Sequence, residues 1–590
     1  MKMKQLRFHR KRIILLVTII IFGFFFNKRE SANASALQVS VQYDQSTPTN
    51  ALEIKVSVHS SSELTMFKYT NKRIANSRHF TKHPTNGTVI AQNAEGEYTF
   101  LAKENGYYSV FAMNSLGEES LVTFKVNNID TTAPVLSVSS TKKSETYSVK
   151  LVGEDDSEKV TLQYVKGSYA SADDEVWKKA ITYTNSVTLT LQEGKYTFLA
   201  KDPAGNTSVL IQRFGENNKS AEEFRAVWIS YLEFKSTGYT KKEFQTHIET
   251  MFNEVVAMNM NAVVVHVRPF GDAMYDSDYF PWSRYVSGTQ GKDPGFDPLE
   301  IMVEEAHKRG LEFHAWLNPY RITSSSTDVM DLSSDNPARI YRTDKKKNND
   351  RYVLTYDGKL YYNPSVKQVQ TLIVNGIEEI VKNYDVDGIH FDDYFYPTLG
   401  KNFTSNFDAQ EYETYKKQQE KKNATYLTIT DWRRENVNTL VRSVYSAVKA
   451  INPEVVFGIS PGGFMDALKA DDKYYVDFET WLGYDGYIDY LCPQLYWSNE
   501  HSVYPFNNIL DRFLSVPRNP DVKIYVGVGV YKAGIKTEET AWYKNANVLR
   551  NMIRYSRNTN QVDGFILYSH RYLVSKKDHK AVINMLMEFK

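Results

Sequence analysis

The chain has almost no cysteine. Cys492 is the only one among 590 residues, so no disulfide can form within the chain. This excludes the small secreted folds that depend on a disulfide framework. Motifs for bound groups are missing as well: no cysteine or histidine spacing is typical of zinc, and no glycine-rich loop is typical of nucleotides. The sequence therefore predicts no metal site and no cofactor.

The chain also lacks a charge excess. Its 71 Lys and Arg residues nearly balance 70 Asp and Glu residues, and the formal net charge is +1. Such a balance gives no bulk attraction to nucleic acid or to an anionic membrane surface. We expect neither as a partner, and we expect short basic runs such as residues 345–347 to be solvated.

One long hydrophobic run is present, near the N-terminus. Six basic residues up to Arg12 precede the uncharged residues 13–26, and small residues follow at positions 31–36. This order predicts a signal for export, cleaved after Ala34 or Ala36. An uncleaved membrane anchor is the alternative, because the charged residues 28–30 could flank it. In both cases residues 1–36 predict a protein that is secreted or held at the cell surface.

Aromatic residues are abundant, at 14% of the chain, and seven of the eight Trp residues lie after position 220. Sugar-binding clefts use such rings because the CH face of a sugar stacks on an aromatic plane. Large hydrophobic cores use them too. The excess by itself favours a carbohydrate ligand only modestly.

Residues 37–215 alternate apolar and polar positions in short runs without helical periodicity, which predicts an all-β region. Segment 106–112 matches segment 194–200, 88 residues later, and the match continues through the following turn. In an alternative register, segment 96–103 matches segment 194–201 at a spacing of 98 residues. The spacing of 88 is the size of one sandwich, so we predict two sandwich domains, residues 37–130 and 131–217.

Two stretches of this region, residues 130–134 and 202–206, resemble the bacterial immunoglobulin-like modules of secreted and surface proteins. The resemblance implies two immunoglobulin-like sandwiches that serve as spacers or as weak wall attachments. No catalytic residue stands out in them. Asp155, Asp156 and Glu158 could suggest calcium, but we expect a solvated acidic turn.

After residue 219 apolar strands alternate with amphipathic helices, which is typical of a parallel α/β domain. Helices are expected at 241–258, 298–309, 366–382 and 432–451. Eight strands are expected at 225–231, 262–267, 311–317, 386–392, 455–460, 490–496, 524–530 and 564–568. Eight such units predict a (β/α)8 TIM-type barrel over residues 220–590. A doubly wound open sheet is the alternative, but its usual glycine-rich first turn is absent.

The predicted fourth strand ends in two acids, Asp392 and Asp393. If His390 points into the barrel, the period of two points Asp392 the same way and places Asp393 in the following loop. Barrel enzymes keep their chemistry at the carboxyl ends of strands. The acids could instead cap a helix or pair with basic residues, but the aromatic residues 394–396 beside them favour a site.

Polar and aromatic residues also gather at the carboxyl ends of other predicted strands. They are Glu233, residues 266–272, residues 314–321, residues 493–497 and residues 568–570. A single buried histidine among them is more often a core residue than a catalyst. Five strand ends with the same character favour one shared site.

Six motifs in this half of the chain match a known family. They are residues 225–228, 261–271, 316–320, 387–397, 458–461 and 493–497. With them, residues 222 to about 575 resemble the bacterial glycosyl-hydrolase-like family 10 barrel. The resemblance implies a carbohydrate-active hydrolase whose partner is a polysaccharide, in particular bacterial cell-wall glycan stripped of its peptides.

Glycoside hydrolysis usually needs two carboxylates. We expect Asp392 as the general acid, with Asp393 beside it raising its proton affinity. Glu233, Asp272 and Asp276 are candidates for a second carboxylate, and none of them is compelling. With an N-acetylated sugar, the acetamide of the substrate can attack instead. The pair together with Tyr496 resembles the arrangement in substrate-assisted chitinases.

The remaining candidates are substrate-binding residues. His266, Arg268, Asn318, Tyr320 and His390 are expected to orient hydroxyls, Trp316 and Trp497 to stack on sugars, and Tyr394 and Gln494 to complete the site. A non-catalytic protein that binds wall polysaccharide is one alternative function. An amylase-like hydrolase is another, although it would ordinarily carry a Glu where residues 460–463 follow the fifth strand.

Overall fold

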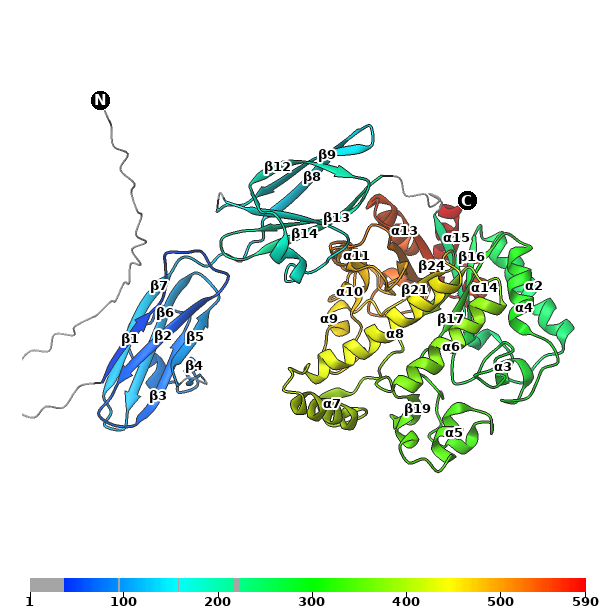
Figure 1. Ribbon diagram of the computed structural model, residues 1–590, viewed down its shortest axis with the longest axis horizontal. Coiled ribbons are helices and arrows are strands. Elements are labelled where there is room, and N and C mark those ends of the chain that lie inside the picture. The colour runs from blue at the N-terminus through cyan, green and yellow to red at the C-terminus, as the bar shows by residue number, and fades with distance from the viewer. Residues whose placement is uncertain (1–36, 94–95, 158, 216–222) are drawn as a thin grey trace, which may run out of the picture. The chain divides into compact units, whose positions relative to one another are not determined.

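The computed structural model describes residues 37–93, 96–157, 159–215 and 223–590 (Figure 1). They fall into two compact units. The second contains Ile211–Lys590 and two short pieces, Gly167–Ala170 and Gly194–Tyr196. The predicted export segment, residues 1–36, lies outside the described residues. Among the residues that are described, no helix has both the length and the apolar character needed to cross a membrane.

The first unit opens with two small sheets whose paired strands run antiparallel. One contains β1 (Gln38–Gln42), β2 (Leu52–His59) and β5 (Tyr98–Ala102), and the other β4 (Thr88–Val89), β3 (Leu64–Thr70), β6 (Gly106–Asn114) and β7 (Glu119–Val126). Leu52, Ile54 and Val56 of β2 are buried and alternate with exposed residues. This period of two gives the sheet one apolar face for the core.

Two further sheets follow with the same composition. The three-stranded one contains β12 (Ser186–Gln192), β9 (Thr146–Glu154) and β8 (Val135–Lys143), and the four-stranded one β11 (Tyr183–Thr184), β10 (Thr161–Lys166), β13 (Gly194–Lys201) and β14 (Thr207–Phe214). The all-β prediction is therefore confirmed. Whether either pair of sheets is immunoglobulin-like stays a prediction, as do the boundaries 37–130, 131–217 and 220–590.

The internal repeat corresponds to equivalent strands. β6 and β13 both lie third in their four-stranded sheets, and each begins with a glycine of positive φ, Gly106 at 151° and Gly194 at 143°. In the turns that follow, Gly117 and Gly205 also have positive φ, which glycine adopts without steric cost. These equivalences support the spacing of 88 residues. The alternative register would match β13 with β5, which belongs to a three-stranded sheet.

Three acidic side chains meet in the first unit. Oxygens of Asp130, Asp155 and Asp202 lie within 4.8 Å of one another. Asp202 accepts hydrogen bonds from the backbone N–H groups of Gly205 and Asn206, so it shapes the turn in which it sits. The group differs from the acidic turn that the sequence suggested, and its geometry is explained by turn formation.

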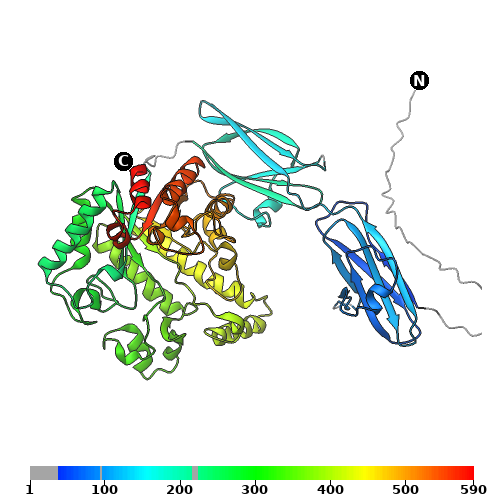
Figure 2. The same cartoon turned by 180° about the vertical axis from the view of Figure 1, so that it is seen from behind.

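The second unit is a closed barrel of eight parallel strands (Figures 1 and 2). In order they are β15 (Phe224–Ile229), β16 (Ala262–Arg268), β17 (Glu312–Leu317), β20 (Gly388–Phe391), β21 (Val456–Ile459), β22 (Tyr490–Leu491), β23 (Lys523–Gly529) and β24 (Gly564–Tyr568). β24 pairs with β15, which closes the barrel and excludes the open doubly wound sheet. All eight predicted strands are present.

One strand is much shorter than the sequence predicts. β22 ends at Leu491, although the apolar run continues to Tyr496. Pro493 follows and has no N–H for a regular ladder. Beyond it, Gln494 makes only isolated bridges to Gly462 and Gly527.

Helices surround the barrel and bury one face each against the strands. The four that the sequence predicts are α2 (Lys241–Ala257), α4 (Pro298–His307), α6 (Lys367–Asn383) and α8 (Ile429–Ile451). Thr240 forms a capping box with Glu243 at the start of α2, and Asp297 caps α4 ahead of Pro298. Further helices include α7 (Ala409–Lys421), α11 (Phe506–Leu514), α13 (Val548–Asn558), α14 (His570–Ser575) and α15 (Lys580–Leu586).

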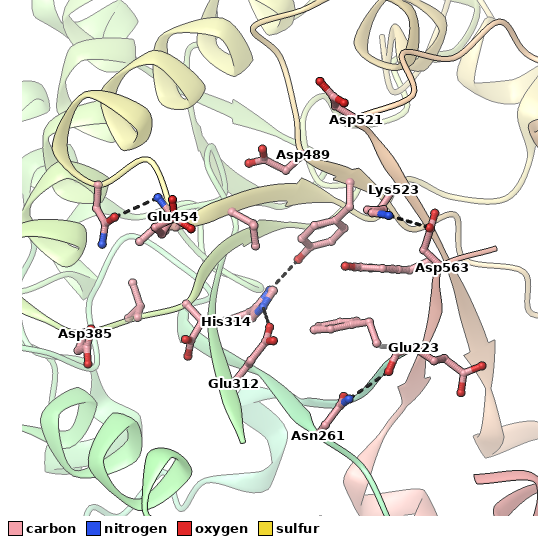
Figure 3. A pocket seen from close by; sticks show the side chains of 18 of the residues that line it. Glu223, Asn261, Glu312, His314, Asp385, Glu454, Asp489, Asp521, Lys523 and Asp563 are labelled. Carbon is pink, nitrogen blue, oxygen red and sulfur yellow. Dashed lines mark hydrogen bonds and ion pairs between the residues drawn. The ribbon is translucent and has the colours of Figure 1, made fainter. Parts of the chain in front are cut away.

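The amino ends of the strands surround a cavity of about 720 Å³ with many acidic side chains (Figure 3). Four Asp or Asn residues at this mouth share one arrangement, because each directly precedes one of the alternate strands β16, β20, β22 and β24. In that order they are Asn261, Asp387, Asp489 and Asp563. Each side chain accepts a hydrogen bond from the backbone N–H near the start of the preceding strand, at 2.7–2.9 Å. We call these four contacts the strand clamps.

Each strand clamp is reciprocal. For example, the side chain of Asp387 accepts from the backbone N–H of Phe313, and the backbone N–H of Asp387 donates to the carbonyl of Phe313. The other three clamps follow the same pattern. Opposite charges neutralise several of the acids, including Asp489 by Lys449 at 2.8 Å and Asp563 by Lys523 at 3.1 Å. The three clamping acids therefore satisfy backbone groups at strand starts, which is a structural role.

Candidate active site

A second cavity, of about 340 Å³, lies at the carboxyl ends of the barrel strands. It is smaller than the cavity at the opposite mouth, but it contains most of the residues that the sequence singled out. Its lining consists of Trp228, Ser230, Tyr231, Leu232, His266, Trp316, Asn318, Arg321, Asp392, Asp393, Tyr394, Ser460, Gln494, Tyr496, Tyr531 and Tyr568.

Asp392 directly follows β20 and is only 2% exposed. The indole Nε1–H of Trp316 donates to its Oδ2 at 3.1 Å, and the backbone N–H of Tyr394 donates to its Oδ1 at 3.0 Å. His390, two residues earlier, also points into the barrel, as the period of two predicts. Asp392 is thus held rigidly at the inner end of the cavity.

The two acids differ in proton affinity. Burial, and next the charge of Asp393, raise the pKa of Asp392 well above its usual value. Burial raises the pKa of Asp393 to about 6, while a hydrogen bond from Gln494 acts in the opposite direction. Burial and the neighbouring charge therefore both favour the protonated form of Asp392, whereas Asp393, with a pKa of about 6, is mostly ionised at neutral pH. One member of the pair can give a proton while the other accepts a hydrogen bond.

His390 forms part of the support beneath the acid pair rather than the lining of the cavity. Its Nε2 accepts from Trp228 at 3.2 Å and lies 3.0 Å from the hydroxyl of Ser460. Its Nδ1 therefore carries the hydrogen and donates to the Tyr490 hydroxyl at 2.9 Å. Burial lowers the pKa of His390 well below its usual value, so the ring is neutral and acts as a fixed spacer.

Trp316 is stacked on His266, with ring centroids 3.3 Å apart and planes at 18°. His266 Nδ1 accepts from the backbone N–H of Tyr231, and Nε2 donates to Asn318 Oδ1 at 3.4 Å. Burial keeps the pKa of His266 well below its usual value. One face of the indole is therefore covered, and its main visible function is to hold Asp392.

Three phenols form another wall of the cavity. Tyr496 lies with its ring centroid 5.9 Å from that of Tyr568 and 5.8 Å from that of Tyr531. Gly529 makes room for it, because a Cβ there would come within 3.1 Å of the Tyr496 ring. Burial raises the pKa of Tyr496 well above its usual value, so it is a hydrogen-bond donor at any physiological pH.

Eight of the predicted site residues line the cavity: Asp392, Asp393, Tyr496, His266, Trp316, Asn318, Tyr394 and Gln494. Besides His390, three other predicted residues lie outside the lining. Arg268 is fully buried with its guanidinium over Phe280, and Tyr320 is fully buried in the core. Trp497 packs against Phe464, with ring centroids 4.5 Å apart.

The candidates for a second carboxylate also lie outside the cavity lining. Glu233 pairs with His570 at 2.7 Å, Asp272 is buried and accepts from Gln290 at 2.7 Å, and Asp276 is exposed. Burial raises the pKa of Asp272 to about 6, but the side chain does not reach the site. Among the residues that line the cavity, Asp392 and Asp393 are the only carboxylates.

Eight lining residues received no role from sequence reasoning: Trp228, Ser230, Tyr231, Leu232, Arg321, Ser460, Tyr531 and Tyr568. A signal existed for several of them. Ser230 and Ser460 each directly follow a barrel strand, the same position that marks Asp392. Extending the strand-end rule to small and apolar residues would have found them.

Comparisons with known proteins identify the family of the barrel. The profile of the family described as glycosyl hydrolase-like 10 matches residues 223–544. Glycosyl hydrolase YngK of Bacillus subtilis is 41% identical over 345 residues, which are 55% of this chain and 64% of that protein. Glycosyl hydrolase DigH of Escherichia coli K12 is 30% identical over 400 residues, 62% of this chain and 87% of that protein.

The chain thus spans less than two thirds of the length of the Bacillus relative. Among solved structures, the PgaB (BpsB) glycoside hydrolase domain from Bordetella bronchiseptica gives a TM-score of 0.41 at 12% identity, covering 62% of this chain and 99% of that one. A TM-score this low supports no inference about the chemistry. The sequence relatives and the family match support glycosidase activity for the barrel.

Proposed function

The chain belongs to the glycosyl hydrolase-like 10 family, and from that premise we propose that it is an exported glycoside hydrolase of bacterial cell-wall glycan. Its proposed substrate is an N-acetylated strand without stem peptides. The observation that carries the proposal is the acid pair Asp392 and Asp393, which shares the cavity with the phenol of Tyr496 and, among the described lining residues, with no other carboxylate.

These three side chains match the needs of substrate-assisted hydrolysis. The acetamide oxygen of the sugar attacks the anomeric carbon while the bond to the leaving oxygen breaks, and Asp392 gives its proton to that oxygen. Asp393, ionised, accepts from the acetamide N–H, and Tyr496 donates to the acetamide oxygen. Water then opens the cyclic intermediate and returns a proton to Asp392.

A two-carboxylate mechanism has less support. Its acids flank the scissile bond at separations of roughly 5–10 Å, and a retaining or inverting partner for Asp392 would have to come from another strand end. Glu233, Asp272 and Asp276 do not line the cavity. An amylase-like reaction has no acid at the end of β21, where the Ser460 hydroxyl instead contacts His390.

The central experiment is mass spectrometry of products from peptidoglycan that an amidase has freed of its peptides. We expect the full-length protein to release short glycans with intact reducing ends. De-N-acetylated strands serve as the matched control, because they lack the attacking acetamide and should be cleaved at least about a hundredfold more slowly. Equal cleavage of both would contradict substrate assistance, and no cleavage of either would favour the alternative of a polysaccharide-binding protein.

The roles of the two acids can be separated with aryl glycosides of N-acetylated sugars. A good leaving group needs little protonation, so Asp392→Asn should recover much of its activity as the leaving-group pKa falls. Asp393→Asn should stay slow for every leaving group, because orientation of the acetamide is lost. If instead Asp393→Asn recovers activity with good leaving groups and Asp392→Asn does not, Asp393 is the acid and Asp392 orients the acetamide.

A further inference from the structure

Of the described residues that line the cavity, Arg321 is the only cation. It lies four residues after the end of β17, and its backbone bridges to Tyr361. Its guanidinium carbon lies 4.7 Å from the ring centroid of Tyr394 and 5.2 Å from that of Phe270. Backbone and rings together fix a positive charge beside the acid pair.

This guanidinium has no carboxylate partner within the described chain. Several other arginines of the barrel are paired with a carboxylate, such as Arg351 with Glu411 at 2.7 Å and Arg433 with Asp408 at 2.8 Å. The charge of Arg321 lowers the proton affinity of both Asp392 and Asp393, but no ion pair or hydrogen bond joins it to either of them. Contact with two rings leaves its in-plane N–H groups available to an acceptor in the cavity.

An arginine held in this way suits a carboxylate better than a hydroxyl. The guanidinium presents parallel N–H donors in a rigid fork, which a carboxylate accepts in bidentate fashion, and the charge-assisted bonds are about twice as strong as neutral ones. The cavity already provides neutral donors and acceptors for sugar hydroxyls, among them Asn318, Ser460 and Gln494. Recognition of a neutral sugar therefore does not require the cation of Arg321.

We propose that Arg321 binds a free carboxylate on the substrate and selects peptide-free strands by that charge; this rests on the function proposed above. In bacterial wall glycan every second sugar carries an ether side chain that ends in a carboxyl group. That group is a carboxylate when the strand is bare and a neutral amide when a stem peptide is attached. Attachment of the peptide removes the charge and adds bulk next to Tyr394, which is half exposed.

A second explanation for Arg321 is that it only screens the acid pair. Screening would act equally on every substrate and would move the pH dependence of all of them together. Recognition of a carboxylate changes the ratio of affinities for two glycans that differ only in that group. The ratio therefore distinguishes recognition from screening.

The experiment measures binding by calorimetry to the full chain carrying Asp392→Asn, which prevents turnover. The two probes are a peptide-free wall tetrasaccharide and the same tetrasaccharide with its carboxyl groups reduced to alcohols. We expect the carboxylate form to bind at least about tenfold more tightly. Adding Arg321→Gln should bring the ratio close to one, and Arg321→Lys should leave an intermediate ratio, because it keeps the charge without the fork.

Arg284→Gln is the matched control, since Arg284 is exposed, lies over the Tyr285 ring at 5.6 Å and does not line the cavity. It should keep the full ratio. A starting ratio near one, or a ratio that Arg321→Gln and Arg321→Lys both leave intact, would overturn the inference. If the protein with Asp392 restored does not cleave the glycan, the proposed hydrolase function fails. The inference about Arg321 is still tested, because the ratio of affinities is measured without turnover.

Discussion

The two mouths of the barrel both collect acidic residues, but they hold them in opposite ways. At the amino ends, Asp387, Asp489 and Asp563 each accept a backbone N–H and have a basic side chain within 3.1 Å. At the carboxyl ends, Asp392 and Asp393 have no basic partner in direct contact within the part of the chain that the structure describes, and burial raises the pKa of both. The amino-end cavity is twice as large and has more acids.

This difference separates acids that stabilise the fold from acids that can react. A carboxylate bound by N–H groups and cations is stable as an anion and has little tendency to exchange protons. A buried carboxyl beside another one retains a proton at neutral pH and can deliver it. Neither the size of a cavity nor the number of acids in it identifies the site of chemistry.

The largest expected effect is the difference in kcat between two Asp→Asn substitutions, one at each mouth of the barrel. Asp392→Asn should lower kcat on peptide-free glycan by about a thousandfold, because the general acid is lost. Its thermal unfolding midpoint should stay near that of the parent, since a neutral amide replaces a carboxyl whose burial already disfavours the charged form. Asp489→Asn should leave kcat unchanged. Turnover assays with calorimetric unfolding measure both, and equal losses of turnover would remove the distinction between the mouths.

The pH dependence of kcat/KM sharpens the same comparison. Asp393 must be ionised, and burial raises its pKa to about 6, so the rate should fall about tenfold between pH 7 and pH 5. The rate should fall again at high pH, when Asp392 loses its proton. Circular dichroism over the same range would check that the fold persists. A flat profile between pH 5 and pH 7 would contradict the assignment of Asp393.

The smallest effect concerns the strand clamps. Asp387→Ala removes the bond to the N–H of Phe313 and should lower the free energy of unfolding by about 1 kcal/mol. Asp387→Asn should cost less, because Asn261 makes the equivalent bond with an amide oxygen. Urea denaturation of the two variants measures the difference, and equal losses in the Ala and Asn variants would show that the charge, not the backbone bond, matters here.

Much of the barrel could be predicted from sequence because its strands are buried on both sides and read as continuous apolar runs. All eight such runs became strands, with ends shifted by one or two residues in most cases. β22 is the exception, because Pro493 ends regular pairing; the sequence carries that signal, but the predicted strand ran through it. The register of the sandwich repeat could be ranked from sequence, but strand order was needed to support it.

The site was predictable as far as the period of two holds. It placed His390 and Asp392 on the inner side of β20, where they lie. It failed for Arg268, because a register shift between His266 and Arg268 turns the arginine away from the cavity. It failed for Trp497 because the regular strand had already ended. A single sequence carries no signal for a bulge.

The strand clamps join the barrel strands two by two: β15 to β16, β17 to β20, β21 to β22, and β23 to β24. No clamp crosses from one pair to the next among the described residues. A cut in the segment between α7 and α8 would leave two complete clamps on each side. The polypeptide is thus organised as two half-barrels, and expression as complementary fragments or as a circular permutant opened at that segment would leave every clamp whole.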